Sequence, residues 1–189
     1  MAFWLLDLFF FFLPLCWLWI EKKQGMPLSA KKAKLLLSEL GFKREKAKIV
    51  LQKTILLLGA LLLTATILAL ALNMAGLNDT KLVEEHAKEI IAIPWLAAYI
   101  LLVRVPCEEI FFRGFLQREI GKLGTTTGIL GSTLLFAIAH LAYGSIGEII
   151  GTFVLGALLA IAYHRSKNII INILAHIAYN FIIFLSIMW

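Results

Sequence analysis

Aspartate is scarce in this sequence. Asp7 and Asp79 are its only two aspartates, so a site built on paired aspartates is not expected. The HExxH pattern, which places two metal-binding histidines and a glutamate on one helix, does not occur, and neither does a GxSG motif. The usual zinc helix and a rhomboid-like serine site therefore have no support.

Cysteine is equally scarce. Cys16 and Cys107 provide no disulfide framework and no CxxC metal site. Cys107 lies beside two glutamates and is on that ground a candidate nucleophile, but no basic partner stands at an obvious spacing. Glutamate and histidine remain as the groups that can carry chemistry.

Apolar residues, in contrast, are abundant. Hydrophobic residues make up 61% of the 189 positions, and the mean hydropathy is +0.89. Apolar runs of about 18 or more residues indicate transmembrane helices. The sequence therefore predicts an all-α, polytopic integral membrane protein of about six spans, which are 3–20, 49–75, 91–118, 125–143, 146–163 and 168–189. The first of them lacks a signal peptide's basic start and cleavage site, so we expect a retained anchor helix.

The formal net charge of +6 is unevenly distributed. Lysine and arginine concentrate in the connections at 21–53, 113–122 and 164–167, whereas 76–90 and 142–148 hold few or none. This alternation predicts that the first group faces the cytoplasm and that both termini lie outside. Because the basic residues adjoin apolar segments, we expect anionic lipid headgroups as the partner and no nucleic acid.

The connection at 21–53 predicts a basic amphipathic helix on the inner membrane surface. Ser29 is a candidate N-cap, Leu35, Leu36 and Leu40 share one side, and Gly41 is a candidate helix stop. A substrate gate is the alternative role. We expect residues 1–90 to form a two-span region with this linker, and residues 91–189 to form the core that carries the site.

Two glutamates and an arginine stand inside the third apolar segment, in PCEEIFFRGF. Ionisable groups within a bilayer are costly, and a functional role is the default hypothesis. Glu109 and Arg113 are four residues apart on a helix and can pair. Glu108 points about 100° away from Glu109, so we expect its partner on another helix.

The fourth and sixth segments offer further polar groups. Phe136 and His140 lie one helical turn apart, and so do His176 and Asn180. A packed polar core is the alternative to a catalytic or ion-handling site. Straight helices would put the two histidines at different depths, so we expect tilt, or irregularity around Gly131 and Gly144, to bring them together.

Three motifs together resemble the CPBP family, which includes the type II CAAX prenyl endopeptidases and the bacterial Abi proteins linked to bacteriocin self-immunity. They are EExxxR at Glu108–Arg113, FxxxH at Phe136–His140 and HxxxN at His176–Asn180. The resemblance implies an intramembrane endopeptidase with its catalytic core in the last four spans. It implies that Glu108 and His140 activate water, that His176 and Asn180 stabilise the oxyanion, and that Glu109 and Arg113 hold the helix.

A metal site is an open alternative for the same residues. One glutamate and two histidines form a known catalytic zinc set, which here would be Glu108, His140 and His176. The expected partners are membrane lipid and a peptide or prenylated-protein substrate. The rival hypothesis is a non-catalytic membrane protein, either a bacteriocin-immunity factor or a small ion- or proton-coupled transporter.

Overall fold

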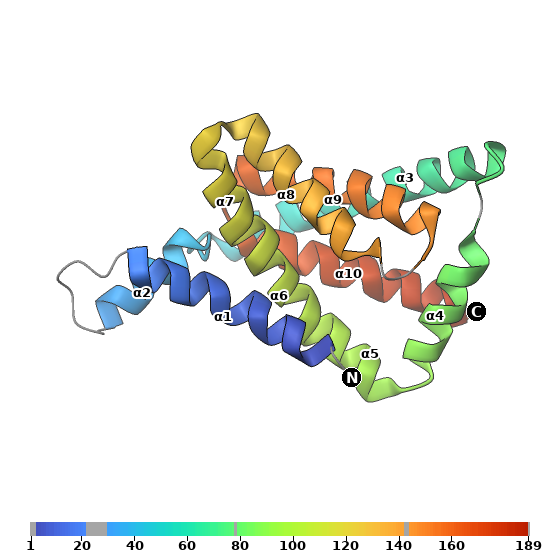
Figure 1. Ribbon diagram of the computed structural model, residues 1–189, viewed down its shortest axis with the longest axis horizontal. Coiled ribbons are helices and arrows are strands. Elements are labelled where there is room, and N and C mark those ends of the chain that lie inside the picture. The colour runs from blue at the N-terminus through green and yellow to red at the C-terminus, as the bar shows by residue number, and fades with distance from the viewer. Residues whose placement is uncertain (1–2, 22–29, 78, 142–143, 189) are drawn as a thin grey trace.

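The protein is described by a computed structural model, which covers residues 3–21, 30–77, 79–141 and 144–188. These residues form helices and connections only, so the predicted all-α class is confirmed (Figure 1). The helices are α1 (Phe3–Glu21), α2 (Ala30–Glu39), α3 (Ala47–Met74), α4 (Thr80–Ile91), α5 (Pro94–Tyr99), η1 (Ile100–Arg104), α6 (Val105–Glu109), η2 (Ile110–Leu116), α7 (Gln117–Ile120), η3 (Gly121–Leu123), α8 (Thr125–Ala139), α9 (Ile146–Ser166) and α10 (Ile169–Met188).

Three of the described helices, α3, α9 and α10, are long and apolar enough to cross a bilayer. A fourth span results if α4 and the long helix at Pro94–Leu123, which meet at a bend of 103°, are counted as one. Helices α1 and α8 are apolar but shorter. Much of the surface of α3 consists of exposed leucine and isoleucine, as expected where lipid replaces protein as the neighbour. The protein is thus a multi-pass membrane protein.

The third predicted segment differs from the structure at its start. A continuous helix begins at Pro94 rather than at residue 91, after the sharp bend at Ala92 and Ile93. Proline has a fixed φ and no N–H to donate, so it suits the first turn of a helix. The segment at 76–90, expected as a loop, is largely the helix α4.

The long helix at Pro94–Leu123 contains two π-helical stretches, η1 and η2. The N–H of Val105 donates to the carbonyl of Ile100, five residues back, just before Pro106. A proline inside a helix removes one N–H and crowds the carbonyl four residues back, and a wider turn relieves this crowding. The second π-helical stretch ends where Gln117 donates to the carbonyl of Phe112. The two irregular stretches flank the glutamates of α6.

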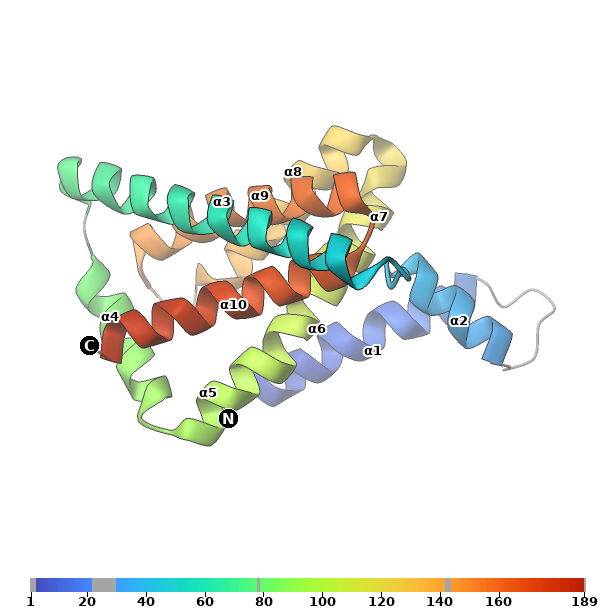
Figure 2. The same ribbon diagram turned by 180° about the vertical axis from the view of Figure 1, so that it is seen from behind.

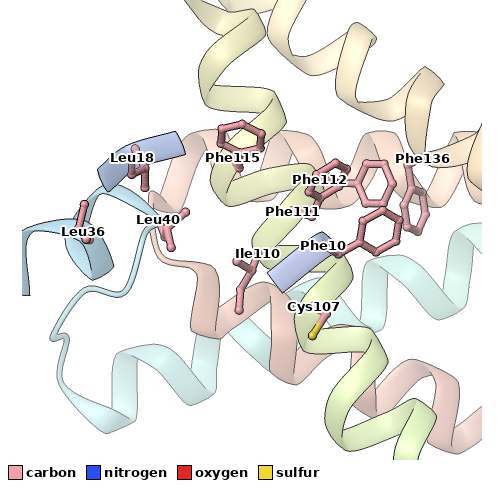
Figure 3. Packing of buried hydrophobic residues seen from close by; sticks show 10 residues of the cluster. All are labelled: Phe10, Leu18, Leu36, Leu40, Cys107, Ile110, Phe111, Phe112, Phe115 and Phe136. Carbon is pink, nitrogen blue, oxygen red and sulfur yellow. The ribbon is translucent and has the colours of Figure 1, made fainter. Parts of the chain in front are cut away.

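One side of this long helix packs against α1 through aromatic rings. Phe10 stacks on Phe111 with ring centroids 4.5 Å apart and meets the edge of Phe112 at 5.4 Å. Cys107 lies in the same buried cluster (Figure 3). Asp7 of α1, although buried, accepts a hydrogen bond of 2.6 Å from the hydroxyl of Tyr99. The N-terminal helix is therefore an integral wall of the bundle.

The predicted amphipathic helix is confirmed as α2. Leu36 and Leu40 are buried in the cluster with α1 and η2, and Gly41 ends the helix with a φ of +90°. Ser29, the expected N-cap, lies outside the described residues. The gate role stays a prediction. The backbone of Leu40 packs closely against the long helix, because a Cβ on Gly114 would stand 2.8 Å from the Leu40 carbonyl oxygen.

The connections gather at two ends of the bundle, as the charge pattern predicts. At one end, Asp79 accepts hydrogen bonds from the N–H groups of Ile146 and Gly147, which joins the two connections that are poor in basic residues. At the other end, Asn168 donates to Glu45, and Arg118 pairs with Glu39, which joins the basic connections. Figure 2 shows these ends on opposite sides of the bundle formed by α3, α9 and α10.

Candidate active site

A cavity of about 410 Å³ lies between α3, α4, α6, α9 and α10. Leucine, isoleucine and alanine side chains of α3, α4 and α10 form most of its wall. Four polar residues of the three motifs line it together, and they are Glu108, His140, His176 and Asn180. The cavity therefore collects polar groups from three separate helical segments in largely apolar surroundings.

Glu109 is the centre of a buried polar network beside this cavity. Its side chain is 0% exposed and forms an ion pair of 3.2 Å with Arg113, as the four-residue spacing predicts. The same carboxylate contacts Nδ1 of His176 at 2.9 Å and accepts from the Asn172 amide at 3.2 Å. Because an ionised carboxylate only accepts, Nδ1 of His176 carries the hydrogen. Glu109 thus fixes the ring, so that Nε2 is the nitrogen left to act on a ligand.

Arg113 is wedged between this carboxylate and two neighbouring helices. Its guanidinium carbon lies 4.2 Å from the ring centroid of Phe136, a cation–π contact, and it donates to the carbonyl of Gly156 at 3.3 Å. Gly156 permits this approach, since a Cβ there would lie 2.9 Å from the Phe136 ring. The network is thus built from side chains of η2, α8, α9 and α10.

Glu108 faces away from Glu109, as predicted, but its partner differs from the expectation. The carboxylate pairs with Nε of Arg104 at 3.1 Å, one turn earlier on the same long helix, and not with a group on another helix. The Arg104–Glu108 ion pair forms because residues 104 and 108 have the same four-residue spacing as Glu109 and Arg113. Glu108 is buried, whereas its arginine is partly exposed.

Phe136 brings the two histidines to one place. Its ring centroid lies 4.6 Å from that of His140 and 6.3 Å from that of His176. Nδ1 of His140 contacts the carbonyl of Phe136 at 2.8 Å, and since a carbonyl can only accept, Nδ1 carries the hydrogen. Of the two expected places of irregularity, Gly131 lies in a regular part of α8, whereas Gly144 has a φ of +71°. Helix α8 ends at Ala139, short of residue 143. His140 is its C-cap.

Three further residues of the site were missed in the sequence. Asn172 stands one turn before His176, as Asn180 stands one turn after it, so a polar residue at every fourth position was the available signal. Arg104 could have been found because it lies four residues before Glu108, a spacing at which two side chains on a helix can pair. Glu148, in the first turn of α9, lines the cavity and interacts electrostatically with His140, Asp79 and Glu108. No local pattern marks Glu148.

Cys107 packs against α1 and does not face the cavity. It lies in the aromatic cluster with α1, so it is a packing residue. Within the described ranges, no three His, Cys, Asp or Glu side chains are grouped closely enough to share a metal ion. Glu108, His140 and His176 therefore line one cavity without forming a ligand set.

Comparison with protein families bears on residues 90–182. They match the model described as "Type II CAAX prenyl endopeptidase Rce1-like". This part of the chain belongs to that family. The match includes every residue of the three motifs, and it begins close to the bend that separates α4 from the long helix.

The Rce1-like region does not form the cavity alone. Helix α3 and most of α4 precede residue 90, yet they supply a large part of the cavity wall. Comparison with curated proteins returned no match, and comparison with solved structures returned none either. The family of CAAX prenyl endopeptidases implies a protease, with a protein or peptide substrate.

Proposed function

We propose that this protein is an intramembrane endopeptidase that hydrolyses a peptide bond at a Glu/His site within the bilayer. One observation carries the proposal: Glu108, His140, His176 and Asn180 line a single cavity in the part of the chain that matches the protease family. A buried carboxylate, two imidazoles and an amide are groups that can move a proton and stabilise an oxyanion.

In the proposed mechanism Glu108 is the general base. It takes a proton from water, with His140 orienting that water through Nε2, and the water oxygen attacks the carbonyl carbon of the substrate. The proton then passes from Glu108 to the nitrogen of the leaving amine as the C–N bond breaks. A general base contributes roughly 10²–10⁴-fold to a rate.

His176 and Asn180 are the proposed oxyanion stabilisers. The side-chain amide of Asn180 can donate directly. Because Nδ1 of His176 donates to Glu109, Nε2 is a donor only when the ring is protonated on both nitrogens. The oxyanion role thus requires a ring that carries a hydrogen on both nitrogens. Glu109 and Arg113 are positioning residues, since they act through the ring and the helix.

Zinc is the alternative to this mechanism. A histidine whose second nitrogen donates to a carboxylate is also the usual arrangement of a metal-binding histidine. The spacing of the described residues does not fit a three-ligand site, so no step is derived through a metal. Zinc bound by Glu108, His140 and His176 stays a prediction.

The substrate proposed is a peptide with an apolar modification, as in CaaX-type prenyl-peptide processing. The mostly aliphatic wall of the cavity supports this choice, because such a wall can bury a hydrocarbon chain. We also propose six spans, with α1 and α8 included, and both termini outside. The basic connections at one end of the bundle support this orientation.

One observation favours a second candidate, a proton- or ion-coupled transporter. Such proteins use interrupted helices near the middle of the membrane. The sequence gives no sign of an interruption, yet α4 and the long helix meet at 103° beside the cavity. A transporter would move protons or ions without cleaving peptide, and this difference separates the two.

The decisive test is cleavage of a farnesylated CaaX peptide by purified protein, measured per folded molecule. We expect cleavage by the parent and a loss of about 10²-fold or more in Glu108→Gln, which keeps the shape but not the base. Glu119→Gln, on the same long helix but outside the cavity, is the matched control and should cleave like the parent.

A strong chelator and metal analysis form the second arm of this test. Activity that survives metal removal eliminates zinc and leaves the glutamate mechanism. Near-stoichiometric zinc that is lost in His140→Ala would establish the alternative. If Glu108→Gln cleaves as well as Glu119→Gln, Glu108 is not the base and the proposed mechanism is wrong.

A further inference from the structure

A second cavity, of about 350 Å³, lies at the basic end of the bundle. It is formed where the connection between α2 and α3, the turn between α7 and α8, and the turn between α9 and α10 meet. Three cationic side chains line it, those of Lys43, Arg118 and Lys167, against one carboxylate, that of Glu39. The cavity therefore has an excess of positive charge, and no part of the proposed peptidase site extends into it.

Its walls are held by specific hydrogen bonds between distant segments. The buried Asn168 side chain donates to Glu45 at 3.1 Å and to the carbonyl of Lys43 at 3.5 Å. The N–H of Ile169 donates to the carbonyl of Gly41 at 2.9 Å. These bonds tie the connection before α3 to the turn before α10. Lys43 and Lys167, which lie 124 positions apart in the sequence, thus face one cavity.

Lys43 lies close enough to Lys167 to disfavour the charge of Lys167. Partial burial lowers the pKa of Lys167, and the charge of Lys43 lowers it further. The Lys167 ammonium donates to Nδ1 of His164 at 3.2 Å, so that nitrogen acts as an acceptor and brings no negative charge. Like charges held together in this way are stabilised by an anion placed between them.

The remaining lining groups suit an oxyanion. Tyr163 lines the cavity and its hydroxyl lies over Gly41, where a Cβ would stand only 2.7 Å from the hydroxyl oxygen. Gly41 also has a φ of +90°, so both its conformation and its lack of a side chain keep this wall in place. Thr125 adds a hydroxyl group to the lining, whereas the hydroxyl of Ser38, which also lines the cavity, donates to the carbonyl of Leu35 at 2.7 Å. Hydroxyl and ammonium donors around a cavity match the acceptor oxygens of a phosphate.

We propose that this basic cavity binds a phosphate group, presented either by the headgroup of an anionic phospholipid or by a free phosphate. The cavity lies among the connections whose lysines and arginines mark one membrane surface, which is the level of the lipid headgroups. Lys43 and Lys167 supply the charge, because Arg118 already pairs with Glu39 at 3.5 Å. The hydroxyl groups of Tyr163 and Thr125 supply further donors. A bound phosphate would join α2, α7 and the turn between α9 and α10.

The test uses the full chain in detergent and a readout that does not depend on peptide cleavage. Binding of inorganic phosphate is measured by calorimetry at matched ionic strength. Binding of phosphatidylglycerol is measured by native mass spectrometry after reconstitution in equimolar phosphatidylglycerol and phosphatidylcholine. The site variant is Lys43→Gln with Lys167→Gln. The control is Lys46→Gln with Lys48→Gln, which removes two exposed lysines near the cavity that do not line it.

We expect the parent and the control to bind alike, and the site variant to bind roughly tenfold more weakly or worse, since charge-assisted hydrogen bonds are lost. Binding of phosphatidylglycerol identifies a headgroup site, and binding of inorganic phosphate alone identifies a free-phosphate site. The proposal is overturned if the parent binds neither, or if both variants weaken equally, which would indicate surface charge only. Should the double variant not fold, Lys43→Gln is compared with Lys46→Gln.

Discussion

Glu109 has a different chemical task from its neighbour Glu108. It is fully buried and compensates the charge of Arg113, and it also orients His176. Glu108 lines the cavity and pairs with a more exposed arginine. One position along a helix turns a side chain by about 100°, and this rotation separates a structural carboxylate from a candidate base.

Glu109→Gln should therefore lower stability, whereas Glu108→Gln should lower activity. An amide in place of the Glu109 carboxylate leaves Arg113 as an unpaired buried charge, which costs about 3–5 kcal/mol in soluble interiors. We expect a clearly lower melting temperature in detergent and a lower yield, with Glu108→Gln melting close to the parent. Equal melting and equal activity per folded molecule in the two variants would contradict this division.

At the scale of elements, the site depends on how closely α9 approaches α8 and the long helix. Gly156 lies against the Phe136 ring and the Arg113 guanidinium, so its missing side chain makes room for both. Gly151 lies on the same helix five residues earlier and has open space where a Cβ would be. A substitution at Gly151 therefore reports the effect of helix propensity alone, and one at Gly156 reports the effect of helix packing as well.

Gly156→Ala should destabilise the protein, and Gly151→Ala should not. Alanine is favoured over glycine in a helix by about 1 kcal/mol, so Gly151→Ala should melt at or slightly above the parent temperature. At Gly156 the added methyl must displace an aromatic ring, and overpacking costs about 1–3 kcal/mol. Thermal unfolding of both variants in one detergent checks this. A higher melting temperature for Gly156→Ala would show that α9 does not pack closely against Phe136 and Arg113.

At the scale of the whole molecule, Asp79 joins two distant connections at one end of the bundle. Burial raises its pKa, but hydrogen bonds from Ser145 and from the N–H groups of Ile146 and Gly147 outweigh this, and the net effect is a lowered pKa. A carboxyl group with a lowered pKa stabilises the fold above its unfolded pKa of about 3.9. This contribution is lost as the pH falls through the folded value.

Asp79→Asn should accordingly be destabilised at neutral pH by about 1 kcal/mol, the usual value of a helix cap. The difference in melting temperature from the parent should shrink as the pH falls below about 4, because the parent then loses its charge as well. Glu85→Gln, an exposed site on α4, serves as the control. A difference that stays constant from neutral to acidic pH would refute the role of the charge.

The orientation of the whole molecule is tested by reporter fusions. A reporter after Lys167 should be cytoplasmic, and one inserted between residues 143 and 147 should be external. The physical reason is that the first site adjoins the basic connections and the second lies in a connection without lysine or arginine. The opposite result at both sites would reverse the proposed topology, although the grouping of the connections at two ends would stand.

The sequence by itself determined the features that depend on local spacing and composition. Apolar runs predicted the apolar helices but not α4. The four-residue interval predicted the Glu109–Arg113 pair, and the charge pattern predicted which connections lie together. These follow from the helical repeat and from the cost of placing charge in lipid, both of which act on neighbouring residues.

The tertiary structure alone decided the contacts between elements. The hydrogen bond from His176 to Glu109 and the meeting of His140 and His176 at Phe136 have no local signal. They depend on the register of one helix against another, which is set by packing details such as the space left at Gly156. Because that register results from many side chains acting together, no short stretch of sequence contains it.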